Sequence, residues 1–462
     1  MQSLEENNEE YRHTLSEDGS ITFFYRPSAR LKNKKILLDS PDLYDLTLDG
    51  NGNRREFEPD PANQEYFLRI DNVPSNLFAT YRIKVIDIVP PGSLETPHEK
   101  IVPPGADQPI VLMNHLNLYA GTHRDLETKP SSIIQEKTAY IRTGIAQIPP
   151  YFKPAASAEI QPHILRGTVE HGLFESSNPI SESPDQIKRD TWVYKPQGFD
   201  SLPPEERKVI FMLDGKDFCE KLTPSFDEAS TQFSKTAIVF IDPGQYHPPP
   251  PPEHIPPDRV QEDYIQKERF SIMLGDELIP KYCHDLEISN TDNVILSAHS
   301  LAAYPMLGVA EKYPDQIGGL FLFSPALNQK EKPNLPPKEL PIFMQIGAIE
   351  DTIPPQAHQN DQHMQDKSRL KATEEFHDEL VSHGNNVQPS LRIHPYGHDS
   401  VHVFEGMVEG MNFHQSRLGA RTTMNMKHLL NEQRAASKPL EAVDDTLQQA
   451  QAITPTPRPG SL

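Results

Sequence analysis

Cysteine is nearly absent from this sequence of 462 residues. Cys219 and Cys283 are the only two, which is too few for a disulfide framework, and their spacing does not match a zinc site. We therefore expect both thiols to be reduced. We also expect no metal ion and no other cofactor.

Long hydrophobic runs are missing as well. No stretch approaches the ~20 apolar residues that a helix needs to cross a bilayer. The chain begins with an acidic segment that contains Glu5, Glu6, Glu9 and Glu10, whereas a signal peptide begins with basic residues and continues into an apolar run of roughly 7 to 15 residues. The sequence therefore predicts a cytoplasmic protein with no membrane span, and export without a cleavable signal stays open.

Basic residues are outnumbered by acidic ones. The chain has 44 Lys and Arg against 66 Asp and Glu, which gives a formal net charge of −22. A charge of this size repels nucleic acid backbones and anionic lipid surfaces. Nucleic acid is therefore not an expected partner.

Proline is abundant instead, with 46 residues, about twice its average usage. The length favours two domains, and the prolines favour loops and tails around them. The predicted parts are an N-terminal tail (1–18), an all-β domain (19–90), a proline-rich connector with little regular structure (91–162), an α/β domain (163–415) and a C-terminal tail with a disordered end (416–462).

The second domain alternates short apolar segments with helical ones. Strands that are apolar on both faces and separated by helices indicate a mostly parallel sheet with helices on each side. This pattern predicts the α/β-hydrolase fold class. The expected strands are 191–194, 209–213, 237–241, 294–297, 319–323, 342–346 and 391–394, and the expected helices are 270–282, 301–313 and 369–383.

A serine stands where one of these buried strands breaks into a helix. Residues 294–303 read Val-Ile-Leu-Ser-Ala-His-Ser-Leu-Ala-Ala. A nucleophile elbow strains the backbone of its serine, so the residues two before and two after must be small. Ala298 and Ala302 meet this requirement in place of the usual glycines. Ser300 is therefore the candidate nucleophile, and a plain helix N-cap is the alternative reading.

A serine nucleophile needs a base, and the candidate is His398. It lies in a loop directly after the last predicted strand, where the hydrolase chain order of serine, acid and histidine places it. His394 and His402 offer a competing reading, since histidines four apart on a helix can ligate a metal. Pro395 and Gly397 disfavour a helix there, so we expect no metal site.

The acid that orients the histidine should follow the predicted strand at 342–346. Glu350 and Asp351 both occupy that loop. The spacing from Gly347 to Pro354 favours Glu350 slightly, whereas aspartate is the commoner residue type in this role. Both stay candidates for the third member of a catalytic triad.

The oxyanion of an acyl-transfer intermediate needs two backbone N–H donors. The amide of Leu301, directly after the serine, is the first candidate. The second is expected from the turn at Gly215 and Lys216, where a buried strand ends and glycine permits close approach. A plain turn is the alternative there.

Several segments together resemble the enterochelin (ferric enterobactin) esterase family. The resemblance covers roughly 164–404, and more faintly the N-terminal strands, which look like the family's immunoglobulin-like domain. It rests on Arg189-Asp190-Thr191-Trp192-Val193-Tyr194-Lys195-Pro196, Phe211-Met212-Leu213-Asp214-Gly215, the segment from Arg269-Phe270 to Leu278-Ile279-Pro280, the elbow at Ser300, and Gly397-His398-Asp399, in this order.

The resemblance implies a serine esterase that cleaves the ester bonds of a catecholate siderophore. Such a substrate carries strong negative charge, so Arg259 and Arg269 are predicted to contact it. Phe218 stands where the family usually has tryptophan, and it is a further expected substrate contact. The alanines of the elbow depart from the family pattern and leave the ester itself open.

Residues 246–257 form a polyproline stretch near the predicted site. It is expected to be a stiff spacer, a lid, or a ligand for a proline-recognising protein. Two other functions stay open beside the esterase: a hydrolase fold that only binds a partner, and an acyltransferase that uses the same three residues.

Overall fold

The computed structural model describes residues 10–28, 31–40, 42–43, 45–47, 49, 54–89, 98–102, 110–116, 133–144, 165–176, 188–242, 268–330, 332–351, 367–384 and 389–417. The chain divides into a compact unit, Met1–Gln415, and a second unit, Ser416–Leu462. The first unit contains every element described below. The polyproline stretch 246–257 lies outside the described residues, and so does most of the predicted C-terminal tail.

The N-terminal part is built from antiparallel strands. One sheet has the order β1-β2-β5-β4, and the other has the order β3-β6-β9-β8 with β7 beside β6. The strands are β1 (Glu10–Leu15), β2 (Ile21–Arg26), β3 (Lys34–Asp39), β4 (Glu58–Asp60), β5 (Glu65–Ile70), β6 (Phe78–Asp87), β7 (Glu99–Val102), β8 (Ile110–Leu116) and β9 (Ile133–Arg142). A short 3-10 turn spans Asp45–Thr47.

Alternation of buried and exposed residues explains how these sheets hold together. In β2, Ile21, Phe23 and Tyr25 are buried while their neighbours are more exposed. They share one apolar core with residues of the other sheet, such as Tyr81 and Ile83 of β6. Because a strand turns every second side chain to the same face, each sheet contributes one face to this core.

Two boundaries predicted for this part are wrong. Strand β1 lies inside the predicted N-terminal tail and pairs with β2 along its whole length. Strands β7, β8 and β9 lie inside the predicted connector, and β9 pairs with β6 from Phe78↔Arg142 to Tyr81↔Ala139. These pairings join residues that are far apart in sequence, so the local periodicity of the sequence cannot predict them.

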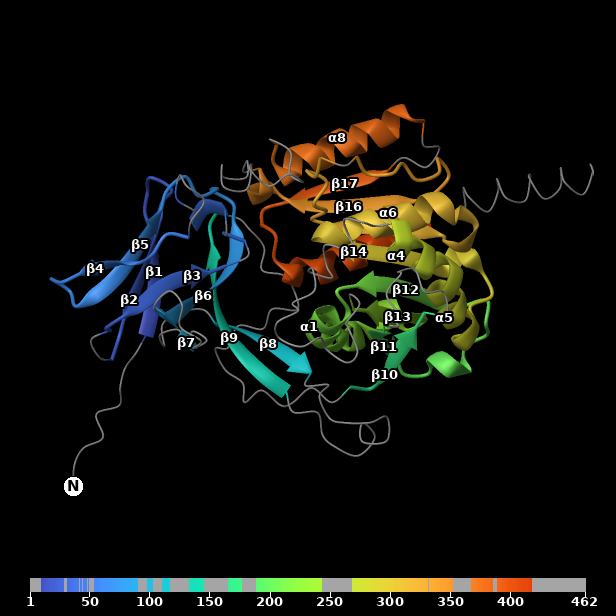
Figure 1. Ribbon diagram of the computed structural model, residues 1–462, viewed down its shortest axis with the longest axis horizontal. Helices are drawn as coiled ribbons and strands as arrows, with labels where there is room; N and C mark the ends of the chain where they lie inside the picture. The colour runs from blue at the N-terminus through green and yellow to red at the C-terminus, as the bar shows by residue number, and fades with distance from the viewer. Residues whose placement is uncertain are drawn as a thin grey trace, which may run out of the picture. The chain divides into compact units, whose positions relative to one another are not determined.

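The second part contains the large sheet that the sequence predicts (Figure 1). Its order is β10-β11-β13-β12-β14-β15-β16-β17; the pairs β10–β11 and β11–β13 are antiparallel and the others are parallel. The strands are β10 (Thr168–Glu175), β11 (Lys188–Lys195), β12 (Lys208–Leu213), β13 (Thr236–Ile241), β14 (Val294–His299), β15 (Gly319–Phe323), β16 (Ile342–Gly347) and β17 (Ser390–His394).

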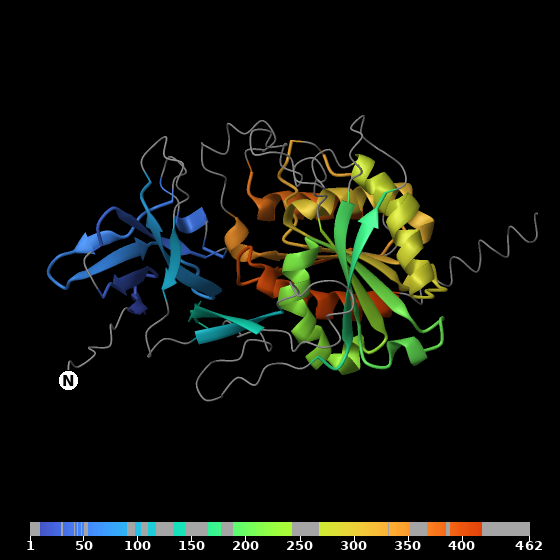
Figure 2. The same ribbon diagram turned by 60° about the horizontal axis from the view of Figure 1, so that its bottom comes forward.

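Helices cover both faces of this sheet (Figure 2). They are α1 (Gly215–Glu228), α2 (Ser230–Phe233), α4 (Glu268–Met273), a π-turn (Leu274–Leu278), α5 (Ile279–Asp285), α6 (Ala303–Lys312) and α8 (Arg369–Ser382), with residues 403–415 also helical. Helices α4, α5, α6 and α8 share one apolar core with one set of strand residues. Helix α1 and residues 403–415 share another core with the alternate set.

The two cores explain why the central strands carry no polar alternation. In β12, Phe211 belongs to one core while Ile210 and Met212 belong to the other. A strand buried on both faces reads as a continuous apolar run. No helix in the described part of the chain is long and apolar enough to span a membrane.

Candidate active site

Ser300 lies in the sharp turn that joins β14 to α6. Its φ is +57°, a left-handed conformation that residues other than glycine rarely adopt. Ala298 and Ala302 are fully buried on either side. Pro305 falls in the first turn of α6, where a missing N–H costs no helical hydrogen bond. The elbow geometry predicted from the sequence is therefore present, and alanine is small enough for it.

A chain of hydrogen bonds links Ser300 to two other side chains. The distance from Ser300 Oγ to His398 Nε2 is 2.8 Å, and the distance from His398 Nδ1 to Glu350 Oε2 is 2.7 Å. Glu350 follows β16 and His398 follows β17, and both strands run parallel to β14. Because parallel strands end at the same edge of a sheet, residues far apart in sequence meet there.

Glu350 is held as a carboxylate. Burial alone raises its pKa, but the charge and hydrogen bond of His398, the charge of Arg369 and a hydrogen bond from Ser324 lower it to about 2. The Gly347 N–H donates to Glu350 Oε1 at 3.1 Å. The side chain is only 3% exposed, so these partners replace water around the charge.

Asp351, the other candidate acid, has a different partner. Its Oδ1 accepts a hydrogen bond from Ser368 Oγ at 2.9 Å, and its side chain is exposed. Ser368 is the N-cap of α8 and also accepts from the Lys371 N–H. The geometry therefore assigns the contact with His398 to Glu350 and leaves Asp351 at a helix start.

His299, which the sequence analysis did not single out, lies against His398. Their ring centroids are 4.6 Å apart. Burial and the nearby charge of His398 lower the pKa of His299 well below its ordinary value. Its Nε2 has no hydrogen-bond partner among the described residues. The neutral ring of His299 thus packs on His398, the candidate base. In the sequence, only the position of His299 directly before Ser300 indicated that it lies at the site.

Ser324 was also missed. It follows β15 with a φ of +43°, and its N–H donates to Gln345 O at 2.7 Å. Its hydroxyl donates to Glu350. Two residues later the Ala326 N–H donates to the Ser300 carbonyl at 3.0 Å. This loop therefore holds both the acid and the elbow, and no local sequence pattern marks it.

The turn after β12 differs from the prediction in one respect. The Lys216 N–H donates to Asp242 Oδ1 at 2.6 Å, so it is not a free donor and its predicted oxyanion role is wrong for this structure. A Cβ on Gly215 would lie 2.6 Å from the Ile241 nitrogen, which explains the glycine by close packing. The oxyanion roles of the Leu301 and Gly215 amides stay predictions.

Asp242 itself carries an unusual pKa. It follows β13 and is only 9% exposed. Burial raises its pKa to about 7; the Lys216 N–H opposes this shift, and the charges of Asp190, Asp214 and Asp217 add to it. Acidic groups therefore gather around the end of β13.

The three predicted substrate contacts have different outcomes. Phe218 is only 3% exposed, and its ring meets His299 edge-on at a centroid distance of 5.7 Å, so it packs beneath the elbow. Arg269 is exposed on α4. Arg259 lies outside the described residues. Contact of any of the three with substrate stays a prediction.

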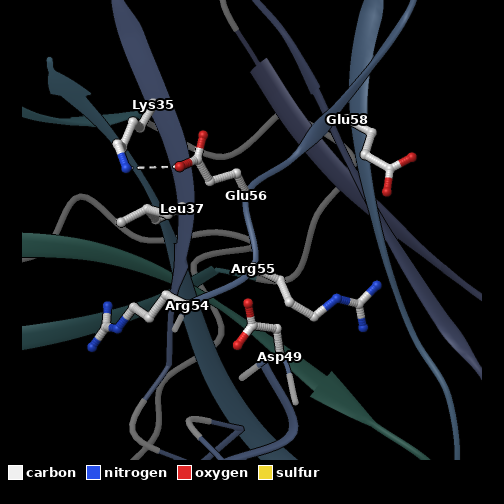
Figure 3. A pocket seen from close by; sticks show the side chains of 7 residues that line it. All are labelled: Lys35, Leu37, Asp49, Arg54, Arg55, Glu56 and Glu58. Carbon is white, nitrogen blue, oxygen red and sulfur yellow. Dashed lines mark ion pairs between the residues drawn. The ribbon is translucent and has the colours of Figure 1, made fainter. Parts of the chain in front are cut away.

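A cavity of about 750 Å³ lies in the N-terminal part, among residues of 35–58 (Figure 3). Its lining residues are Lys35, Leu37, Asp49, Arg54, Arg55, Glu56 and Glu58, so its basic and acidic groups balance. Lys35 pairs with Glu56 at 2.8 Å. None of the predicted site residues lines this cavity. Within the described residues, no group of His, Cys, Asp or Glu side chains is arranged to hold a metal ion.

A mostly parallel sheet with helices on both faces, and a strained serine after a central strand, define the α/β-hydrolase class of fold. No protein-family model matches this chain, and comparison with curated protein sequences finds no match.

Solved structures do match it. The enterobactin esterase of Shigella flexneri, in the presence of enterobactin, is 12% identical, with 88% of this chain and 96% of that chain covered and a TM-score of 0.55. Ferric enterobactin esterase from Salmonella typhimurium is 11% identical, with 88% and 97% covered and a TM-score of 0.51. At these identities the likeness is one of fold, and it supports the α/β-hydrolase fold class that the sequence predicts.

Proposed function

We propose that this chain is a serine esterase that cleaves carboxylic esters through an acyl-enzyme. The observation that carries the proposal is the hydrogen-bond chain from Ser300 through His398 to Glu350. Ser300 stands in a strained turn, and both partner side chains come from later strand ends of the same sheet edge. This arrangement has the geometry and chain order of a serine hydrolase site.

The geometry suggests the following steps. Ser300 Oγ attacks the ester carbonyl while His398 Nε2 takes its proton, and Glu350 stabilises the imidazolium that forms. The Leu301 N–H donates to the oxyanion of the tetrahedral intermediate. His398 then gives the proton to the leaving alcohol. Water, activated by the same histidine, hydrolyses the acyl-enzyme and restores Ser300.

The fold supports the proposal without deciding the substrate. Two of the solved structures that match are enterobactin esterases, so we include an ester of a catecholate siderophore among the proposed substrates. We also propose that the N-terminal sheets form an immunoglobulin-like domain. The charges of Arg369 and Lys221 act on His299 beside the elbow, whereas Asp214 and Asp242 lie at the ends of β12 and β13. Both the ferric complex and the iron-free siderophore therefore belong in the substrate panel.

Hydrolysis of short-chain nitrophenyl esters and of catecholate siderophores, with and without iron, tests the function. Ser300→Ala should lower kcat/KM by roughly 10⁴-fold or more, because the three residues act as a unit. Ser297→Ala is the matched control, since the Ser297 hydroxyl is buried in β14 and has no hydrogen-bond partner among the described residues. It should keep full activity.

A fluorophosphonate probe separates the esterase from a fold that only binds a partner. The probe should label the folded wild-type chain at Ser300 and leave Ser300→Ala unlabelled. A folded wild-type chain that neither labels nor cleaves any ester of the panel would contradict the proposal.

A further inference from the structure

The loop that carries His398 is held by a carboxylate from the N-terminal part of the chain. Asp42 Oδ1 accepts hydrogen bonds from the Gly397 N–H at 3.2 Å and the Asp399 N–H at 3.3 Å. These two amides flank His398 directly. The Asp42 side chain is 0% exposed. One buried carboxylate oxygen thus fixes the backbone on both sides of the candidate base.

The other oxygen of Asp42 is tied to its own domain. Asp42 Oδ2 accepts from the Thr80 N–H in β6 at 2.9 Å. Thr80 also reaches the same loop, because its hydroxyl donates to Asp399 Oδ2 at 2.6 Å. The neighbouring Phe78 N–H donates to Pro395 O at 2.9 Å. Strand β6 and Asp42 therefore hold the histidine loop at several points along its backbone.

The groups that face Asp42 explain why a charged residue is tolerated there. A buried carboxylate is costly unless hydrogen-bond donors replace water, and Asp42 has three backbone N–H donors. His402 Nε2 lies 3.3 Å from Asp42 Oδ1, and its ring stacks on Tyr396 with centroids 3.6 Å apart. The Asp399 carboxylate, which lies near Asp42, accepts a hydrogen bond from the Thr80 hydroxyl. A neutral apolar residue would leave these amide donors buried without partners.

We propose that Asp42 is a positioning residue for His398. It acts through the loop backbone and keeps His398 Nε2 at hydrogen-bond distance from Ser300 Oγ. Catalytic side chains must be held within a fraction of an ångström, so loosening this loop should slow the chemical step more than it weakens substrate binding. This inference rests on the proposed esterase function, and it gives the N-terminal part a direct role in that function.

The test compares Asp42→Asn and Asp42→Ala with Asp39→Asn. Asp39 is the matched control, because it is also a buried carboxylate of this part but pairs with Arg82 and Lys84 of β6. Fluorophosphonate titration counts reactive sites, and turnover is then expressed per reactive site. Both Asp42 variants should lose about tenfold or more in kcat per site with KM within about twofold. Asp39→Asn should stay within about twofold of wild type in both.

Counting per site separates positioning from a loss of folded protein. A purely structural role would reduce the number of reactive sites and leave kcat per site unchanged, and that result would overturn the proposal. Hydrogen exchange gives a readout independent of activity: exchange in residues 395–402 should rise in Asp42→Ala and not in Asp39→Asn, and equal exchange would also overturn it. A wild-type chain that does not label would overturn the esterase proposal itself, which distinguishes the two failures.

Discussion

At the scale of single residues, the site depends on which of two adjacent acids faces the histidine. Glu350 lies 2.7 Å from His398 Nδ1, whereas Asp351 accepts from Ser368. A one-residue difference separates a buried acid held by His398, Gly347 and Arg369 from an exposed one at the start of a helix. The sequence could not choose between them, because the choice depends on the turn that follows β16.

This difference predicts opposite results for two matched variants. Glu350→Gln keeps the shape of the side chain but cannot stabilise the His398 imidazolium, so kcat should fall by about 10³- to 10⁴-fold. Asp351→Asn should stay within about threefold of wild type, since its amide oxygen can still accept from Ser368. Steady-state kinetics on one nitrophenyl ester checks both. Similar losses in the two variants would contradict the assignment of Glu350.

At the scale of elements, the end of β13 contacts the first turn of α1 through Asp242, a carboxyl group with a raised pKa. Asp242, at the end of β13, accepts from Lys216 in the first turn of α1. Its pKa is about 7 in the folded chain, against about 3.9 in an unfolded one. The unfolded chain therefore releases this proton at lower pH. The charge on Asp242 destabilises the fold as pH rises from about 4 to about 7, and the cost is fully present above pH 7.

Asp242→Asn should therefore be more stable than wild type at pH 8, by on the order of 2 kcal/mol, because the amide oxygen can still accept from Lys216 without carrying charge. The gain should shrink steadily toward pH 4. Denaturant unfolding at pH 5 and pH 8 measures it. Asp217→Asn is the control, since Asp217 is an exposed acid in the same first turn of α1. A gain independent of pH would count against the raised pKa.

The helices and strands that could be predicted are those that a local sequence pattern specifies. The meeting of their ends could be predicted from the parallel arrangement of the strands. The strands β12 to β16 are buried, mostly apolar runs, and α8 (Arg369–Ser382) begins at the N-cap Ser368. Ser300, the adjacent pair Glu350 and Asp351, and His398 could be placed at one sheet edge because each follows a predicted strand, and parallel strand ends converge. Strand β9 could not be predicted, since its partner β6 lies far away in sequence.

The residues of the site that the sequence analysis missed also depend on contacts between segments that are far apart in sequence. His299, Ser324 and Asp42 act through contacts that exist only after the sheet and the two domains have assembled. Of the two candidates for the second oxyanion donor, the Lys216 amide donates to Asp242 instead, and the sequence gives no sign of this hydrogen bond. The local sequence pattern thus locates the candidate catalytic residues, whereas the residues that contact and hold them are determined by the tertiary structure.

At the scale of the whole molecule, the candidate site belongs to both parts of the chain. Asp42 holds the loop of His398, and Ile349, next to Glu350, is buried in the apolar core of the N-terminal sheets. The Ile349 N–H also donates to Tyr396 O at 3.3 Å, in the histidine loop. The loops of the acid and of the base are therefore both anchored to the N-terminal part.

Two isoleucines on either side of this boundary allow a direct test. Ile349 packs in the N-terminal core, whereas Ile342, at the start of β16, packs in the core of the large sheet. Both are buried, so Ile349→Ala and Ile342→Ala should each lower the free energy of unfolding by roughly 2–4 kcal/mol. Only Ile349→Ala should also reduce kcat per reactive site, by about tenfold, because only it releases the backbone beside Glu350. Equal kcat per site in the two variants, at matched loss of stability in denaturant unfolding, would show that the N-terminal core supports the fold but not the alignment of the acid.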